Sequence, residues 1–235
     1  MFSFLLQYLT SINTSVNGLG MKGLNVFLHI PKTGGTAIRT FFQKCPGFTF
    51  PLHSVVAKNC ESNKYYAVIR HPYDRLFSSF TYYKYGSLRY NRLKRIATNM
   101  TFLTFLQGLS NKSSHDHRES VSITTQRRKH TPWVWSVHFQ DQYSWFRNCA
   151  RQVHILCHSE RLLEVVANLT SCKHLPFRNV NPTLPSNESK VRWDHLDESL
   201  KKFVRTKYKH DFEWFESRCP CSSDILPLTV VRPRV

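Results

Sequence analysis

The sequence has few acidic residues, and they are unevenly distributed. Of 235 residues, 15 are Asp or Glu and 33 are Lys or Arg, so the formal net charge is +18. Before residue 141 there are four acidic residues against eighteen basic ones. Such a positive field favours polyanionic partners: nucleic acid, anionic membrane, sulfated or uronic glycans, or nucleotide phosphates. Charge by itself does not choose among them.

A zinc-binding pattern and a long apolar run are also missing. The seven cysteines include no CxxC pair with a histidine partner, and Cys219-Pro220-Cys221 is too tight for a zinc knuckle, so we expect no metal. The apolar residues 2–9 fall short of the ~20 residues that a membrane span requires. They also lack the basic residues and the cleavage site of a signal peptide. We expect residues 1–23 to form a loosely ordered leader.

Two features that are present indicate an oxidising, glycosylating compartment. Seven cysteines are more than a cytosolic chain of this size needs. Asn-x-Ser/Thr sequons are also frequent. They lie at Asn13, Asn99, Asn111, Asn168 and Asn187. We therefore expect a protein of the secretory pathway, although residues 2–9 do not show how it would enter.

Short apolar runs alternate with helical patterns along the chain. This alternation predicts a single-domain α/β fold, with a parallel sheet and helices on both faces. The domain is expected over residues 24–218, with a basic insertion at 84–131 and a tail at 219–235. Strands are predicted at 25–30, 47–50, 65–69 and 153–157, and helices at 36–44, 74–85, 100–109, 159–169 and 197–208.

Residues 29–36, His-Ile-Pro-Lys-Thr-Gly-Gly-Thr, have the pattern of a phosphate-binding loop. A strand ends, two glycines permit a tight turn, and a helix begins, which directs backbone N–H groups and the positive helix end at an anion. The lysine precedes the glycines, so this is not a Walker A loop. The candidate phosphate ligands are Lys32, Thr33, Gly34, Gly35 and Thr36.

Residues 70–80, Arg-His-Pro-Tyr-Asp-Arg-Leu-Phe-Ser-Ser-Phe, form a second candidate phosphate site. Arg70 closes a strand, Pro72 breaks the chain, and Ser78 lies on the next helix. This spacing can bring a guanidinium and a hydroxyl onto one phosphate. Arg75 is expected to brace the loop through a carboxylate or carbonyls.

These two motifs resemble those of the Golgi carbohydrate sulfotransferases, which include the heparan sulfate 2-O- and 6-O-sulfotransferases. Residues 29–36 resemble their 5′-phosphosulfate loop, except that Ala37 stands where the family often has Ser or Thr. Residues 70–80 match their 3′-phosphate motif, Arg-x-Pro-x-x-Arg-x-x-Ser-x-Phe/Tyr. The resemblance runs from about residue 25 to 215. It implies a P-loop-like fold and 3′-phosphoadenosine 5′-phosphosulfate (PAPS) as the sulfuryl donor.

The resemblance also implies catalytic roles. Lys32 would stabilise charge beside the scissile sulfate–phosphate link. His53, which follows the second predicted strand, resembles the family's catalytic base and would activate the acceptor hydroxyl. Glu61 is the alternative base. His29 and His71 are expected to have structural roles.

Basic residues interleaved with aromatic ones are candidates for the acceptor site. Charge pairing combined with ring stacking suits an acidic glycan, and it would also suit RNA. The substrate-binding candidates are Arg89, Arg92, Lys94, Arg127 and Arg128, with Lys84 and Arg95 in the same clusters. Further candidates for the acceptor cleft are Trp135, His138 and Gln140.

The cysteine pairing has only a family precedent. Cys149 and Cys157 flank a predicted strand and resemble a disulfide pair of the heparan 2-O-sulfotransferases. Cys219 and Cys221 are candidate partners of Cys172, and the spacing does not choose between them. Residues 178–181 are a candidate for a late loop that closes over the nucleotide.

The sequence therefore predicts transfer of a sulfuryl group from PAPS to a carbohydrate hydroxyl in the Golgi lumen, with an acidic glycan as acceptor. No metal and no nucleic acid are expected to take part. A kinase is disfavoured, because neither Walker A nor a Mg²⁺-binding acid after a strand is present. Two alternatives stay open: a protein-tyrosine sulfotransferase, and a non-catalytic heparin- or nucleic-acid-binding module on a sulfotransferase scaffold.

Overall fold

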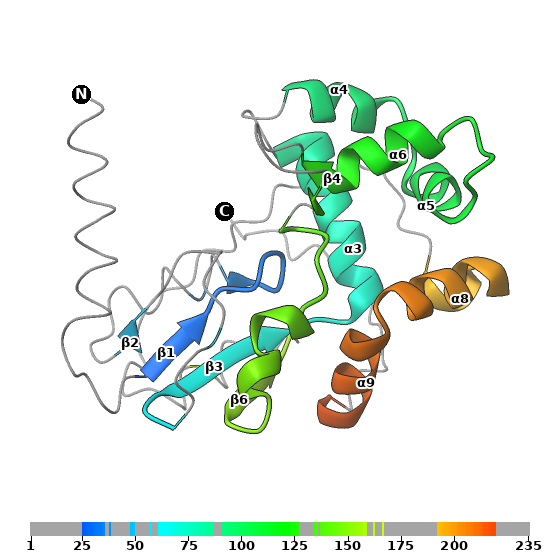
Figure 1. Cartoon of the computed structure of the whole chain (residues 1–235). Coiled ribbons are helices and arrows are strands. Elements are labelled where there is room, and N and C mark those ends of the chain that lie inside the picture. Colours follow the sequence, from blue (N-terminus) through cyan, green and yellow to red (C-terminus); the bar gives the residue numbers. More distant parts are fainter. Residues whose placement is uncertain are drawn as a thin grey trace, which may run out of the picture.

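The fold is taken from a computed structural model of the chain (Figure 1). The structure describes residues 25–35, 38, 48–49, 57, 61–86, 91–126, 134–135, 137–158, 162, 166 and 192–219. The predicted leader at 1–23 lies outside these residues, as does all of the predicted tail except Cys219. Within them, no helix is long and apolar enough to span a bilayer.

A four-stranded parallel sheet forms the centre of the fold (Figure 1). Its order is β2-β1-β3-β6, and each neighbouring pair is parallel. The strands are β1 (Asn25–Leu28), β2 (Phe48–Thr49), β3 (Lys64–Ile69) and β6 (Val153–Cys157). All four strands that the sequence predicts are present, so the α/β parallel-sheet prediction is confirmed.

Both faces of the sheet are buried. Phe27 and Val68 point to one face and Leu28 and Ile69 to the other, and each of these side chains is at most 2% exposed. This explains the near-continuous apolar runs in the sequence, because a parallel strand is covered on both sides. Around Leu28 and Ile69 a cluster of buried residues forms, to which Phe215 contributes.

Two helices lie at the C-terminal end of the described chain, and the second of them contributes Phe215 to this cluster. Asp197 caps α8 (Glu198–Lys207) by accepting a hydrogen bond from the backbone N–H of Leu200 at 2.9 Å. This confirms the helix predicted at 197–208. The chain then turns directly into α9 (Lys209–Arg218), which contacts β6 and α3.

A helix begins at Pro72, where the missing proline N–H costs nothing. This helix, α3 (Pro72–Thr81), ends in a π-helical turn, η1 (Tyr82–Gly86). Beyond it, the structure has three helices where the sequence predicts one. They are α4 (Asn91–Thr98), α5 (Phe102–Ser110) and α6 (His117–Thr124), and they gather near the end of α3 that is farther from the sheet (Figure 1).

The three helices share a buried cluster with α3 and α8, built around Phe80, Phe102 and Phe105. The sequence shows only α5, because α4 and α6 are eight residues each and largely polar. Packing, and not local propensity, therefore stabilises the two short helices. The remaining short elements are β4 (Thr125–Gln126), antiparallel to β5 (Val134–Trp135), and the 3₁₀ turns η2 (Tyr143–Trp145), η3 (Arg147–Cys149) and η4 (Trp193–His195).

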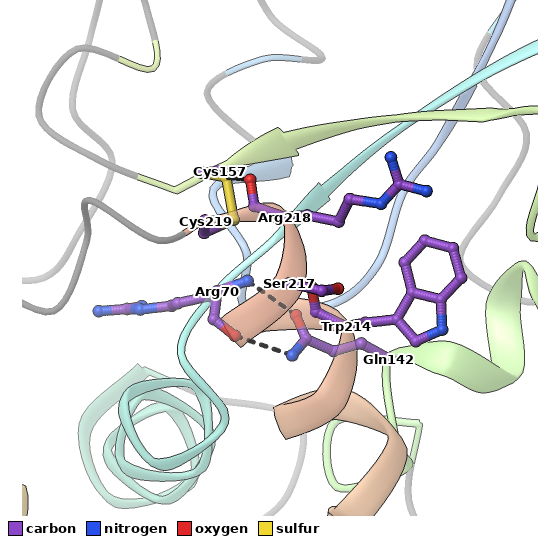
Figure 2. Close-up of a disulfide and its surroundings, with 7 residues drawn as sticks. All are labelled: Arg70, Gln142, Cys157, Trp214, Ser217, Arg218 and Cys219. Atoms are coloured by element: carbon purple, nitrogen blue, oxygen red, sulfur yellow. Dashed lines mark hydrogen bonds between the residues drawn. A yellow bond between two sulfur atoms is a disulfide. The ribbon is translucent and has the colours of Figure 1, made fainter.

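The predicted Cys149–Cys157 disulfide is wrong, and so is Cys219 as a partner of Cys172, whereas the alternative partner Cys221 lies outside the described residues. Cys157 at the end of β6 is bonded to Cys219 at the end of α9, with the Cα atoms 5.7 Å apart (Figure 2). Cys149 also belongs to a disulfide, so its partner lies outside the described residues. The family precedent fails because α9 brings Cys219 to the end of β6, and spacing along the chain does not reveal that contact.

Candidate active site

The two predicted phosphate motifs lie at the same edge of the sheet. In the parallel β1–β3 pair, Leu28 lies opposite Ala67, so both strands end at the same edge. Residues 31–35 follow β1, and Arg70 follows β3. Ligands bind at this carboxyl edge in open α/β sheets. The topology therefore assembles one site from segments about 40 residues apart.

The loop after β1 has an unusual backbone. Lys32 has a φ of 68° and Gly34 a φ of 87°. Glycine adopts this left-handed region freely, whereas the lysine is there at a cost of about 1–2 kcal/mol. The Thr33 hydroxyl donates a hydrogen bond to the Ile30 carbonyl at 2.9 Å. The proton of this hydroxyl is thus used within the loop.

Two histidines near the loop have packing contacts. A Cβ atom on Gly35 would overlap the imidazole of His29, so residue 35 has no space for a side chain. His71 contacts the rings of Phe212 and Phe215 edge-on, at 5.4 and 5.3 Å between centroids. Both observations agree with the structural roles expected from the sequence.

Gln142 holds the backbone of Arg70 in place (Figure 2). The Arg70 N–H donates to Oε1 of Gln142 at 2.9 Å, and Nε2 of Gln142 donates to the Arg70 carbonyl at 2.8 Å. Oδ2 of the buried Asp211 accepts from the Gln142 backbone N–H at 2.8 Å, and Oδ1 accepts from that of Tyr143 at 2.9 Å. The Arg70 guanidinium reaches the Lys32 carbonyl at 3.4 Å. The Arg70 side chain is thereby aimed at the loop.

Arg75 joins the loop to the segment before η2. It is 2% exposed, and its guanidinium donates to the carbonyls of Pro31 at 2.9 Å, Gln140 at 2.6 Å and Val137 at 3.4 Å. Of the two bracing modes that the sequence left open, the structure has the carbonyl mode. Arg75 is therefore part of the support of the site.

The Lys32 ammonium lies over the ring of Tyr82, 4.4 Å from its centroid. Burial, and after it the charges of Arg70 and Arg75, lower the pKa of Lys32 to about 8. Ser78 lies on α3 one turn before Tyr82, on the same helix face. Ser78 therefore lies on the side of α3 that faces the loop and its Lys32 ammonium.

His158 is a residue of the site that sequence reasoning missed. It follows β6, and its backbone N–H donates to the Ile69 carbonyl at 2.8 Å. Its Cδ2 atom lies 3.2 Å from where a Cβ of Gly34 would be. Burial and then the charge of Arg70 lower the pKa of His158 to about 4, so the imidazole is neutral at pH 7. Its place directly after a predicted strand was the available signal.

Two candidates, Glu61 and Lys84, are not brought to this site, and the roles of the other predicted residues stay predictions. The alternative base, Glu61, is exposed and precedes β3, so it lies at the opposite edge of the sheet from the loop. Lys84 is buried and donates to the Met100 carbonyl at 3.0 Å, so its ammonium has a packing role. Lys94 is half-buried on α4, and of Arg92 the structure gives the backbone in α4. Outside the described residues lie His53, Thr36, Arg89, Arg127, Arg128, Cys172 and residues 178–181.

Comparison of the sequence with known proteins identifies its family. A family model described as the sulfotransferase family matches residues 25–216, well over half of the chain. No curated protein and no solved structure gives a match. The matched range contains the loop, Arg70 and the residues that hold them. The chain therefore belongs to the sulfotransferase family.

Proposed function

We propose that the protein transfers a sulfuryl group from PAPS to a hydroxyl of a carbohydrate, with an acidic glycan as acceptor. The observation that carries the proposal is the joining of the Lys32 loop and Arg70 at one sheet edge, where the guanidinium touches the loop at 3.4 Å. PAPS carries a phosphosulfate at one end and a phosphate at the other. The site has one cationic side chain after each of two strands, Lys32 after β1 and Arg70 after β3, so that each could bind one end.

The loop suits the 5′-phosphosulfate end of the donor. Gly34 adopts the left-handed backbone that the turn needs, and helical backbone begins at Gly35, the kind of helix start that attracts an anion. The donor supplies the activated sulfuryl group. Lys32 would neutralise the charge that develops on the leaving phosphate oxygen. Arg70 and Ser78 would hold the 3′-phosphate.

The proposed base is His53, which would take the proton of the acceptor hydroxyl. The neutral His158 is near the loop, but its imidazole is beside Gly34, on the donor side. Its proposed role is therefore to support the loop and not to activate the acceptor. The pH dependence of turnover would distinguish the two histidines.

An acidic glycan is favoured as acceptor by the charge of the chain, which is +18 and concentrated before residue 141. The Cys157–Cys219 disulfide and the five sequons support a place in the secretory pathway. We propose the Golgi lumen, where such acceptors are sulfated. Tyrosine-containing acidic peptides carry the same charge and are the alternative acceptor.

The test is calorimetric titration with 3′,5′-adenosine bisphosphate, the desulfated product, with ATP as the comparison ligand. We expect Arg70→Ala to weaken bisphosphate binding about 30- to 100-fold, which corresponds to the loss of a charge-assisted contact. The backbone pairing with Gln142 survives this change. Arg95→Ala, which removes an exposed guanidinium on α4, is the matched control and should bind like wild type.

Absence of bisphosphate binding to the folded protein would contradict the proposal. Binding that Arg70→Ala leaves unchanged would contradict the role of Arg70. If the bisphosphate binds, transfer of labelled sulfate from PAPS to desulfated heparan chains and to acidic tyrosine peptides distinguishes the two acceptor classes. His53→Ala should abolish transfer but not bisphosphate binding, whereas a non-catalytic binding module would show no transfer in wild type.

A further inference from the structure

The end of α3 contains a π-helical turn, Tyr82–Gly86. Such turns are rare and often lie at functional sites, because they rotate the following side chains relative to the helix. Here the turn carries two adjacent tyrosines with different environments: Tyr83 is fully buried, and Tyr82 is half-buried. The feature therefore presents one ring, Tyr82, toward the loop after β1, where its centroid lies 4.4 Å from the Lys32 ammonium.

The ring of Tyr82 is held from behind by His138. The two rings are stacked, with centroids 4.9 Å apart and an interplanar angle of 22°. His138 is itself fixed, because its Nδ1 is 3.1 Å from the Tyr83 hydroxyl and its carbonyl accepts a hydrogen bond from Ser79 Oγ at 2.7 Å. Tyr82 is thus one layer of a stack whose other layer is anchored to the core.

Lys32 needs such a partner because its surroundings disfavour its charge. Arg70 approaches from the end of β3 and Arg75 from α3, and both repel an ammonium. Asp74, also on α3, is the carboxylate that acts on Arg70. An aromatic face attracts a cation through the negative charge above the ring. The contact with Tyr82 therefore opposes the effects of burial and of the two guanidinium groups.

We propose that Tyr82, backed by His138, is a positioning residue that keeps the Lys32 ammonium charged and directed at the donor site. This inference rests on the proposed function, in which Lys32 stabilises the leaving phosphate. Tyr82 acts through Lys32 and not on the donor. Its ring, and not its hydroxyl, performs this role, so phenylalanine should replace it and an aliphatic residue should not.

The first test does not require activity. Trace labelling of the intact protein with an amine-acetylating reagent across pH 6–10, read by mass spectrometry of the Lys32 peptide, gives the pKa of Lys32. In wild type we expect a value of about 8. Tyr82→Leu should lower the pKa by about half a unit to one unit, the shift that loss of a cation–π contact produces, and Tyr82→Phe should not change it.

The chain offers a matched control in the same turn. Tyr85 places its ring over a different ammonium, that of Lys84, at 5.4 Å. Tyr85→Leu therefore removes a ring of the same kind while leaving Lys32 untouched, and the Lys32 labelling curve should not move. His138→Leu removes the layer behind Tyr82, and a smaller downward shift is expected. It serves as the second variant if Tyr82→Leu does not fold.

The second test uses turnover. Tyr82→Leu should lower kcat about 3- to 10-fold at pH 9 and by less than about 2-fold near pH 7, with bisphosphate affinity within about 2-fold of wild type, so the fall of kcat at high pH should begin at a lower pH. An unchanged labelling curve in both Tyr82→Leu and His138→Leu would overturn the inference, whether or not the protein transfers sulfate. If wild type does not bind the bisphosphate, the proposed function fails and the positioning role with it. A shifted labelling curve would then show that the contact itself exists.

Discussion

Replacing Gln142 with glutamate tests how the fold positions Arg70. Gln142 is buried, at 1% exposed, and both ends of its side-chain amide form hydrogen bonds with Arg70. Oε1 accepts from the Arg70 N–H, and Nε2 donates to the Arg70 carbonyl. Gln142→Glu keeps the shape but exchanges Nε2 for oxygen. When ionised, that oxygen faces the Arg70 carbonyl at 2.8 Å and Oδ2 of Asp211 at 3.4 Å, and both are acceptors.

The protonated form of the introduced carboxyl restores the original pattern. Its O–H donates to the Arg70 carbonyl and its C=O accepts from the Arg70 N–H. The folded protein therefore raises the pKa of this carboxyl above the ~4.3 of the unfolded chain. The stability that the protonated carboxyl contributes is fully present below the unfolded-chain pKa and is lost as pH rises from there through the folded pKa. At 1.36 kcal/mol per pH unit, the variant should be destabilised by about 1 kcal/mol at pH 5 and by up to about 4 kcal/mol at pH 7.5.

The assay is urea unfolding of Gln142→Glu and of wild type at pH 5 and at pH 7.5. The free energy of unfolding of wild type is subtracted at each pH, so that the pH dependence of wild type cancels. Gln142→Met is the matched comparison, since it leaves the two Arg70 backbone groups unpaired at any pH. It should be destabilised by about 2–4 kcal/mol at both values. A Gln142→Glu difference that does not grow between pH 5 and 7.5 would refute the proposed pairing.

Three further predictions concern the support of the site. Arg75→Lys should lower the free energy of unfolding by about 2–3 kcal/mol in urea titration, because one ammonium cannot span three carbonyls; an unchanged midpoint would contradict this. Gly35→Ala should cost about 1–3 kcal/mol through overlap with His29, and adding His29→Ala should recover part of that loss in a double-mutant cycle; strict additivity would argue against the overlap. Replacing Cys157 and Cys219 together with alanine should cost about 2–4 kcal/mol by calorimetry, since the disulfide closes a separation of 62 residues; under reducing conditions the difference between variant and wild type should disappear.

The sequence predicts those parts of the site that local chemistry encodes. A strand that ends in Pro-Lys-Thr-Gly-Gly and a strand that ends in Arg-His-Pro each carry their own signals. β6 (Val153–Cys157) is predicted to the residue. Because all of these strands are parallel, their ends meet at one edge without any knowledge of the loops between them. The prediction that Lys32 and Arg70 share a site therefore required only the fold class.

Long-range contacts are the part that the sequence does not reveal. The pairing of Gln142 with Arg70 spans 72 residues, and that of Gln142 with Asp211 spans 69. No residue type or spacing distinguishes Gln142 from an ordinary surface glutamine before the fold is known. The same reason explains the wrong cysteine pairing, since Cys157 meets Cys219 only after α9 has packed against β6.

The position of Asp211 late in the chain has a consequence for synthesis, because the support of Arg70 is incomplete until that residue is added. The two motifs that resemble donor-binding sequences are complete once residue 80 has been added. The carboxylate that holds Gln142, and through it Arg70, is added more than 130 residues later. A nascent chain that stops before residue 211 carries both motifs but not the support of the guanidinium. We therefore expect affinity for the proposed donor to emerge late in translation, after residue 211 has been added.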